Sequence, residues 1–276
     1  MTAPQSQGEA GAGVGVTGGR YGEDLFEPEL PGEADRIDAA ALVYDPVTFR
    51  RLRALGAGPG MRCLEVGAGT GTVARWLVEE ADVDEVVALD RDTSALAHLE
   101  GPRLRALAAD LTDEGLRPGG FDLIHARFVL MHLPTRRRLI SRLAGWLNPG
   151  GRLVLGDAVD VPNVLDDSSA YRRTMDAMWR ALRETIGTDI SSVPAYPHFL
   201  REEGLREVAA ELYCPPLVAG GPAARFWSQT WSRMRPELER AGRDHADALD
   251  EALAYLAAPE LAELGPGMAM AWGTRR

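Results

Sequence analysis

The sequence contains no lysine. All 30 basic residues are arginine, against 41 acidic residues, which gives a formal net charge of −11. A chain without lysine cannot form a side-chain Schiff base, which excludes pyridoxal chemistry and lysine-dependent aldolases. It also cannot contain a Walker A phosphate loop, whose lysine reaches the phosphates. The negative charge argues against a dedicated nucleic-acid-binding protein, because neutralising phosphates requires clustered basic side chains.

Cysteines and long apolar runs are also scarce. Cys63 and Cys214 give neither a metal-ligand spacing nor a disulfide framework, and no histidine, cysteine and acidic cluster suggests a metal. No apolar run approaches the ~18 residues of a membrane span. Residues 1–20 are rich in small residues and lack the features of a signal peptide. We therefore expect a disordered tail there and a cytoplasmic location.

The order of patterns along the chain predicts an α/β protein. Strand-like and helical segments alternate over residues 62–155 at the spacing of βαβ units, which favours a parallel, doubly wound sheet. Two later strand-like segments, 208–213 and 267–272, are expected to complete a seven-stranded, Rossmann-like, mostly parallel sheet with an antiparallel edge strand. The apolar pattern of residues 34–55 is interrupted at Pro46, which predicts two short helices.

Further helical stripes lie outside this predicted sheet. We expect an N-terminal helical cover over residues 21–55 and a main domain over 56–276 with lid insertions at about 161–198 and 222–264. Aromatic stripes at helical spacing are more often core than pocket, yet the sheet already has its own covering helices. We therefore expect some of these additional helices to cover an apolar or aromatic small-molecule substrate. The residues predicted for the substrate lid are Tyr21, Tyr44, Trp179, Tyr196, Trp227 and Trp231.

The most informative motif is the glycine pattern Gly67-x-Gly69-x-Gly71, which follows a predicted strand and precedes a predicted helix. Glycines there allow positive φ and let a ligand approach the backbone at the end of the strand. A dinucleotide fingerprint would place its third glycine at position 72, which is Thr72. A pyrophosphate-bearing cofactor is therefore disfavoured.

Three acidic residues surround this loop in the predicted sheet. Glu65 precedes it, and a carboxylate there disfavours a phosphorylated ligand and favours one that carries an ammonium or sulfonium group. Asp90 ends the second strand, where an acid accepts hydrogen bonds from both ribose hydroxyls. Asp110 closes the third strand and could accept a hydrogen bond from an adenine amino group. The spacing predicts a nucleoside-sized site at the strand ends.

From residue 62 to residue 157 the sequence resembles the class I S-adenosylmethionine-dependent methyltransferases that act on small molecules. The segments that carry the resemblance, in matching order and spacing, are LEVGAGTGTVARWL at 64–77, VVALD at 86–90, AADL at 108–111, FDLIHARFVLMHLP at 121–134 and LNPGGRLVLGD at 147–157. The resemblance implies S-adenosylmethionine as cofactor and S-adenosylhomocysteine as product.

The resemblance also implies a role for individual residues. The loop of Gly67, Ala68 and Gly69 would pack on the methionine part of the cofactor. The remaining contacts implied are Asp90 and Arg91 at the ribose, Asp110 and Leu111 at the adenine, and Ala126 and Arg127 near the methionine end and the sulfonium.

The acceptor is less defined. Residues 125–129 lack the Asn/Asp-Pro-Pro-Tyr stretch of enzymes that methylate base amines or glutamine amides, so a nucleic-acid substrate is disfavoured. Oxygen, nitrogen and carbon acceptors stay open, as do a monomer and a homodimer. An oxygen acceptor of high pKa needs a general base, for which His132 and His198 are the candidates. The enlarged lid and the arginine-only composition suggest specialised metabolism.

Three other hypotheses stay open. The same scaffold can keep the cofactor and catalyse a different reaction, such as a cyclisation or decarboxylation. A nicotinamide-dependent oxidoreductase would require tight NADH binding without S-adenosylmethionine binding. A noncatalytic regulatory protein would have a pocket closed off from the sulfonium methyl.

Overall fold

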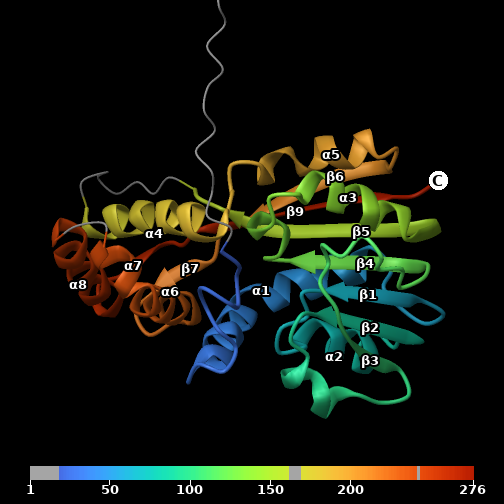
Figure 1. The fold of residues 1–276 in the computed structure, drawn as a ribbon, viewed down its shortest axis with the longest axis horizontal. Coiled ribbons are helices and arrows are strands. Elements are labelled where there is room, and N and C mark those ends of the chain that lie inside the picture. Colours follow the sequence, from blue (N-terminus) through green and yellow to red (C-terminus); the bar gives the residue numbers. More distant parts are fainter. Residues whose placement is uncertain (1–18, 162–168, 241–242) are drawn as a thin grey trace, which may run out of the picture.

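The computed structural model describes residues 19–161, 169–240 and 243–276. Its centre is a seven-stranded sheet (Figure 1). The strands are β1 (Arg62–Val66), β2 (Glu85–Asp90), β3 (Leu104–Ala108), β4 (Phe121–Arg127), β5 (Leu147–Val159), β6 (Arg206–Tyr213) and β9 (Gly267–Thr274). They lie in the order β3-β2-β1-β4-β5-β9-β6, and β9 runs antiparallel to both of its neighbours.

This sheet confirms the predicted fold class. The five strands expected between residues 62 and 155 are present, and β4 and β5 extend beyond the segments predicted for them. The antiparallel strand β9 lies one position in from the edge, and the edge strand β6 runs with the others. Because β1, β4 and β5 are parallel neighbours, their carboxyl ends meet at one edge of the sheet.

Helix α1 (Glu33–Ala54) is a single helix of 22 residues, so the prediction of two short helices was wrong. Pro46 lies inside it, where proline removes one backbone N–H and crowds the preceding turn. Tertiary contacts outweigh that local cost. Val47 and Leu52 are buried, and Arg51 pairs with Glu211 on β6. The residues around Pro46 are therefore held in helical form by packing on the sheet.

The layers around the sheet are formed by short helices. Between β2 and β3 lies the 3-10 helix η1 (Ser94–Leu99), and another 3-10 turn, η2 (Leu130–His132), follows β4. The α-helices of these layers are α2 (Thr72–Glu79), α3 (Arg136–Gly145) and α5 (Tyr196–Glu202), and η3 (Val193–Ala195) precedes α5. Their apolar faces and the strands form one continuous core.

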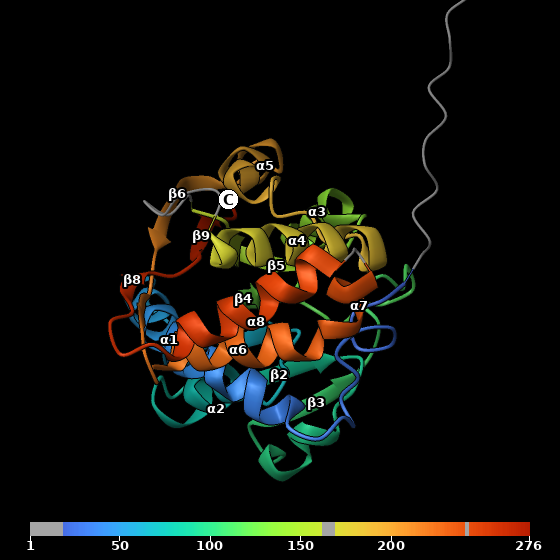
Figure 2. The ribbon, with the colours of Figure 1, turned by 90° about the vertical axis from the view of Figure 1, so that its left-hand side faces the viewer.

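A helical unit lies beyond the carboxyl ends of β4 and β5, whose arrowheads point toward it (Figure 1). We define this unit as α4 (Ala170–Ile186), α6 (Pro222–Arg233), α7 (Arg235–Arg240) and α8 (Arg243–Ala257). Helix α8 packs against both α4 and α6 (Figure 2). The unit comes from the two predicted insertions, and a two-stranded sheet that was not predicted, β7 (Pro216–Val218) with β8 (Ala262–Leu264), accompanies it.

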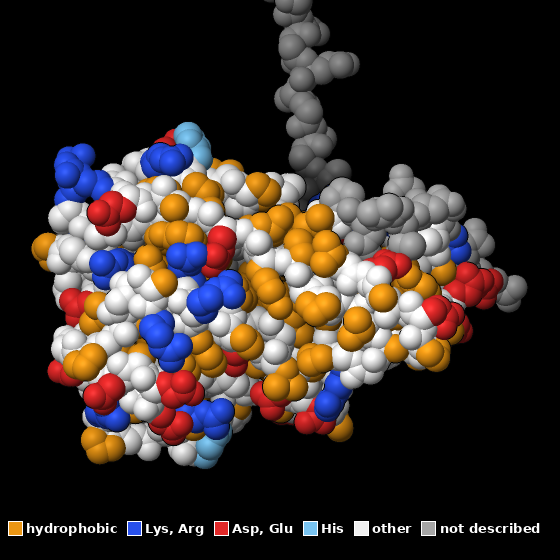
Figure 3. All heavy atoms as spheres, turned by 180° about the vertical axis from the view of Figure 1, so that it is seen from behind, with side chains coloured by type: hydrophobic (Ala, Val, Ile, Leu, Met, Phe, Trp, Pro, Cys, Tyr) orange, Lys and Arg blue, Asp and Glu red, His pale blue; other side chains and the backbone are white. Residues whose placement is uncertain are grey.

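The surface charges, the helices and the groups of possible metal ligands give few further indications of function. On the face seen from behind, arginines and acidic residues are interspersed rather than gathered into patches of one sign (Figure 3). Within the described ranges, no helix has the length and apolarity needed to cross a bilayer. The same ranges contain no group of three or more histidine, cysteine or acidic residues that could hold a metal ion. The tail predicted at 1–20 lies almost entirely outside the described residues.

Candidate functional site

The glycine loop joins β1 to α2 at the carboxyl edge of the sheet. Gly67, Gly69 and Gly71 have φ angles of 67°, 54° and 80°, in the left-handed region that favours glycine. The expectation of positive φ in this loop is therefore confirmed. Packing adds a second constraint, because a Cβ on Gly67 would collide with the side chain of Val129, and one on Gly71 with Leu99.

We expect Gly67→Ala to destabilise the protein, because the methyl group adds a collision with Val129 to an unfavourable φ. The free energy of unfolding should fall by about 1–3 kcal/mol. Urea denaturation followed by circular dichroism measures this loss. Gly69→Ala is the matched control, since its Cβ would meet Ile37 at an ordinary 3.6 Å. Equal losses in the two variants would contradict a specific role for the Val129 contact.

Asp90 ends β2 beside this loop. Its Oδ2 accepts a hydrogen bond from the backbone N–H of Gly69 at 2.8 Å, and its Oδ1 accepts one from Arg91 at 2.7 Å. Burial raises the pKa of Asp90, and these backbone N–H groups act in the opposite direction. Each carboxylate oxygen keeps a further lone pair, so Asp90 can still accept hydrogen bonds from a ligand hydroxyl.

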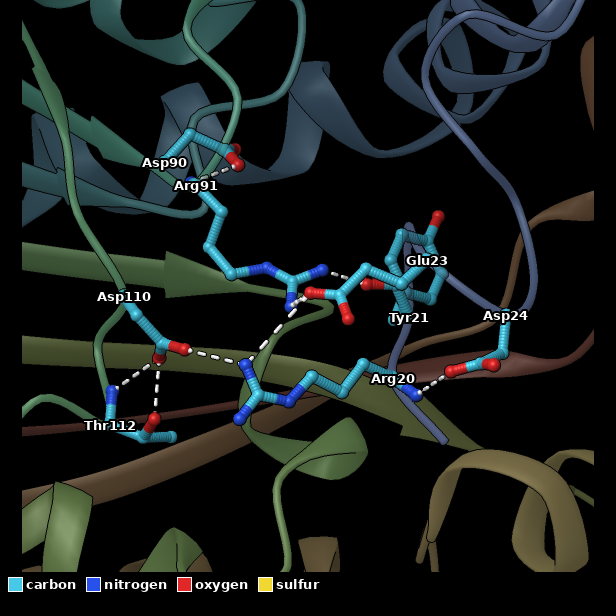
Figure 4. A network of polar contacts seen from close by, with 8 residues as sticks. All are labelled: Arg20, Tyr21, Glu23, Asp24, Asp90, Arg91, Asp110 and Thr112. Carbon is cyan, nitrogen blue, oxygen red and sulfur yellow. Dashed lines mark hydrogen bonds and ion pairs between the residues drawn. The ribbon is translucent and has the colours of Figure 1, made fainter. Parts of the chain in front are cut away.

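Residues 19–31, here called the N-terminal strap, lie over the carboxyl ends of β2 and β3. Arg20 Nη1 lies 3.2 Å from Asp110 Oδ2, and Arg91 Nη1 lies 2.7 Å from Glu23 Oε1 (Figure 4). These contacts cross between segments far apart in the sequence. The strap therefore covers the place where the sequence predicts the nucleoside.

Asp110 is held in place by its own turn as well as by the strap. The backbone N and Oγ1 of Thr112 lie 2.7 and 2.6 Å from Asp110 Oδ1 (Figure 4). Burial acts to raise the pKa of Asp110, but the hydrogen bonds from Thr112 and the charge of Arg20 lower it. The next residue, Leu111, is buried. The carboxylate is thus ionised at neutral pH and paired with a cation of the strap.

Tyr21 leads the strap into an aromatic group. Its ring centroid lies 4.8 Å from that of His132 and 5.2 Å from that of Phe26. Its hydroxyl accepts a hydrogen bond from Arg36 Nη2 at 2.6 Å. The strap, α1 and the turn after β4 therefore meet at Tyr21.

His132 lies in this group as a neutral side chain. Its Nδ1 is 2.8 Å from Thr188 Oγ1, just beyond the end of α4. Burial, together with the nearby charges of Arg36 and Arg136, lowers the pKa of His132 to about 3. An imidazole with so low a pKa is a weak base. His132 is nevertheless close to the glycine loop, because its backbone N–H donates to the carbonyl of Val129, whose side chain lies against Gly67.

The other candidate base, His198, is not brought to the site. It is 69% exposed on α5, where its Nε2 lies 3.3 Å from Glu202. The sequence showed that His198 follows the insertion but not which face of the helix it occupies. His198 is therefore a surface residue in contact with Glu202, and the structure does not support a base role for it.

Glu65 is committed to a partner that sequence reasoning did not assign. Both of its carboxylate oxygens lie within hydrogen-bond distance of His125 Nδ1, at 2.8 and 3.0 Å. The two residues are register partners on β1 and β4 and are both buried. Contrary to expectation, the structure does not leave this carboxylate open to a ligand. The other ring nitrogen of His125, Nε2, is buried and has no hydrogen-bond partner.

The end of β4 is fixed to α1. Arg127 lies 2.6 Å from Asp45 Oδ1 and 3.0 Å from Thr48 Oγ1, and the preceding Ala126 is buried. Phe128 then takes a φ of 57°, a conformation that bulky residues rarely adopt. The Arg127 guanidinium therefore anchors α1 in this arrangement rather than reaching toward a ligand.

Asp157, the last residue of the segments that carry the family resemblance, was given no role from the sequence but organises the turn after β4. It is 1% exposed and accepts hydrogen bonds from the backbone N–H groups of Val129 at 3.0 Å and Met131 at 3.1 Å. The hydroxyl of Tyr196 donates a third at 2.5 Å. Burial raises the pKa of Asp157 to about 7, against the effect of these donors.

The six residues predicted for the substrate lid fall into different places. Tyr21 lies on His132, whereas Tyr44 is buried on α1 and donates to the carbonyl of Pro266 at 3.1 Å. Tyr196 is buried on α5 and bound to Asp157, so its lid role is corrected to support of the turn. The three tryptophans all lie inside the helical unit: Trp179, Trp227 and Trp231.

We expect stability to decrease as the pH rises toward neutrality, because folded Asp157 holds its proton more tightly than the unfolded chain does. Its contribution is complete below the unfolded pKa of ~3.9 and is lost as the pH passes about 7. The slope should be at most about 1.4 kcal/mol per pH unit. Urea titrations between pH 5 and 8 measure it. Asp157→Asn, which does not titrate, should flatten the profile, and an unchanged slope would disprove the assignment.

The comparisons with known proteins agree with this geometry. Residues 64–153, from β1 into β5, match the model of a methyltransferase domain family. The chain is 30% identical over 159 residues to phosphoethanolamine N-methyltransferase 3 of Arabidopsis thaliana, covering 55% of this chain and 30% of that protein. It is 27% identical over 204 residues to trans-aconitate 2-methyltransferase of Deinococcus radiodurans, covering 70% of this chain and 77% of that protein.

A solved structure extends the likeness to the whole fold. A cyclopropane-fatty-acyl-phospholipid synthase-like protein from Lactobacillus casei has a TM-score of 0.58 and 14% identity, covering 88% of this chain and 91% of that one. The chain spans less than a third of the length of the plant phosphoethanolamine methyltransferases that it matches. Over residues 64–153 the chain matches a methyltransferase domain, which agrees with the resemblance to the class I S-adenosylmethionine-dependent methyltransferases.

Proposed function

We propose that this protein transfers the methyl group of S-adenosylmethionine to an oxygen, nitrogen or carbon atom of a small apolar or aromatic molecule. The observation that carries the proposal is Asp90, a partly buried carboxylate with unused lone pairs, beside glycines in the left-handed region. When bound, S-adenosylmethionine supplies a methyl group on a sulfonium and so is already activated. The protein's own residues therefore mainly have to align the acceptor with it.

The proposal gives each predicted cofactor residue a task. Asp90 accepts from the ribose hydroxyls, and the backbone of residues 67–69 borders the methionine part. Asp110 and the buried Leu111 border the adenine. Since Asp110 is bound to Arg20 here, a contact between Asp110 and adenine requires the strap to exchange this ion pair for the nucleoside (Figure 4).

His132 fits a wall of the site better than a strong general base. With its pKa lowered to about 3, it is a poor proton acceptor for a hydroxyl of high pKa. This favours an acceptor that is ionised, acidic or a free amine, for which alignment is enough. Arg127, which is bound to α1, acts in this proposal through the position of the helix rather than through contact with the sulfonium.

The setting of the reaction is part of the same proposal. The names of the relatives, a phosphoethanolamine and a trans-aconitate methyltransferase, support a small-molecule acceptor. The large helical unit supports an acceptor from specialised biosynthesis. The two free cysteines support the reducing cytoplasm as the compartment. We place no nucleic acid or membrane among the partners, and we propose a monomer or a homodimer.

We expect Asp90→Ala to weaken binding of S-adenosylhomocysteine, because the variant loses hydrogen bonds to a charged acceptor. The loss should be about 1–3 kcal/mol, or roughly 5- to 150-fold in Kd. Calorimetric titration measures it. Glu85→Ala, at the opposite end of the same strand and paired with Arg62, is the matched control and should bind normally. Equal affinity in wild type and Asp90→Ala would refute the ribose assignment.

Donor consumption over a panel of acceptors tests the reaction itself. Methyl transfer requires one S-adenosylhomocysteine for each acceptor converted. Conversion of an acceptor with the donor intact would instead support the cyclisation or decarboxylation alternative. A wild-type protein that binds neither S-adenosylmethionine nor its product would contradict the proposed function.

A further inference from the structure

Two helices of the helical unit carry buried hydrogen-bond donors that have no partner. The orphaned atoms are Tyr171 Oη, Thr174 Oγ1 and Trp179 Nε1 on α4, and Trp227 Nε1 and Trp231 Nε1 on α6. All five residues are at most 6% exposed. A buried donor left unpaired is strongly unfavourable, and native proteins almost always pair such groups. Five of them on two helices indicate missing acceptors, which a ligand entering between the helices could supply.

These donors belong to one interface. The rings of Tyr171 and Trp231 lie 5.5 Å apart, and those of Trp179 and Trp227 lie 6.1 Å apart. Trp227 and Trp231 are one helical turn apart and so share a face of α6. Thr174 lies on α4 between Tyr171 and Trp179. The unpaired donors therefore occur where side chains of α4 meet side chains of α6, next to α8, which packs against both helices.

The interface presents uncharged hydrogen-bond donors, which are hydroxyl groups and indole N–H groups. An indole N–H can only donate, so three of the five atoms need an acceptor on the ligand. The buried carboxylate nearest to α6, Glu33, is already neutralised by Arg36 and Arg233. Among the described residues of α4 and α6, the buried polar or charged side chains are Thr174 and Thr230. The carboxylates of Asp160 and Glu263 act on Tyr171 but are already bound, to Arg172 and to the hydroxyl of Tyr255, so a cationic amine would find no unpaired counter-charge among these described residues.

The interface is continuous with the candidate cofactor site through a line of rings. Trp227 and Phe226 lie 4.9 Å apart, and the Arg36 guanidinium lies 5.6 Å from the Phe226 ring. On its other side Arg36 lies 4.3 Å from the Phe26 ring, which leads to the strap. The complete line of side chains is Trp179, Trp227, Phe226, Arg36, Phe26, Tyr21 and His132.

We infer that the interface between α4 and α6 binds the methyl acceptor, and that the part of the acceptor held there is uncharged, planar and aromatic with carbonyl or ether oxygens, while the group that takes the methyl, an acidic hydroxyl or a free amine, lies outside the interface. The rings supply stacking surface, and the indole and hydroxyl groups donate to the oxygens. The identification of the ligand as the acceptor rests on the proposed function, whereas the binding itself does not. Phosphoethanolamine, the substrate in the plant relatives' names, is excluded from this interface by its charge and shape.

Indole N–H resonances of the ¹⁵N-tryptophan-labelled full chain test the inference directly. The probes are flavone, xanthone and coumarin, which are neutral and planar and carry a ring carbonyl. We expect the resonances of Trp179, Trp227 and Trp231 to move downfield on addition of a probe, with Trp76 unchanged. The cationic planar compound 9-aminoacridine should leave all of them in place. Saturating probe with no movement of the three resonances would mean ordered water only and would overturn the proposal.

Substitutions that remove one N–H and keep an aromatic ring provide the quantitative test. Trp227→Phe and Trp179→Phe should each weaken binding of the tightest neutral probe by about tenfold. The double variant should be weaker still. Trp76→Phe is the matched control, because Trp76 is also buried in a helix but its Nε1 donates to Glu80 at 3.1 Å. Circular dichroism confirms that each variant is folded.

The outcomes separate this inference from the proposed function. Failure of all three neutral probes to bind, or binding that is indifferent to Trp227→Phe and Trp179→Phe, overturns the inference. S-adenosylhomocysteine binding, measured on the same variants, should remain at the wild-type level. If the wild type binds a neutral probe through these indoles but does not bind S-adenosylhomocysteine, the donor interface stands and the methyltransferase proposal fails.

Discussion

The buried guanidinium of Arg36 is the contact on which the arrangement of this molecule depends. It is 5% exposed, forms two hydrogen bonds with Glu33 and donates to the hydroxyl of Tyr21. A cation removed from water this completely is tolerated only when its partners are in place, and loss of one partner is strongly destabilising. A further contact, from Arg36 Nη1 to Thr230 Oγ1 at 3.4 Å, reaches α6, so a single charge joins α1, the strap and α6. The strap cannot move independently of the helical unit while this network is intact.

Helix α1 carries that constraint to the sheet. Asp38 accepts from Thr70 in the glycine loop at 2.9 Å, and Asp45 holds Arg127 at the end of β4. The helix therefore contacts the loop, the end of β4, the strap and α6 along its length. A ligand in the loop and a ligand in the helical unit would press on the same rigid element.

Features that depend on neighbouring residues could be predicted from the sequence, whereas features that depend on contacts between distant segments could not. The positive φ of the glycine loop, the place of Asp90 at a strand end and the alternation of strands and helices depend on short segments, and the structure has them as expected. The Glu65–His125 pair depends on the register of β1 with β4, which no local pattern specifies. The helical state around Pro46 depends on packing against the sheet, and the exposure of His198 depends on which face of α5 is buried. The support of the turn by Asp157 required three distant segments to be placed together.

The helical unit is assembled from two separate insertions, one before β6 and one after it. Helix α4 therefore packs on α8, and its rings meet those of α6, only across a long stretch of intervening chain, which gives these contacts a high sequence separation. Loop closure over such distances is entropically costly and slow. The interface between α4 and α6 should consequently form late in folding, after β6 and β9 have paired, and open first when the protein is perturbed. The interface proposed for the acceptor would thus be the last to assemble, and substitutions in it should disturb folding of the central sheet little.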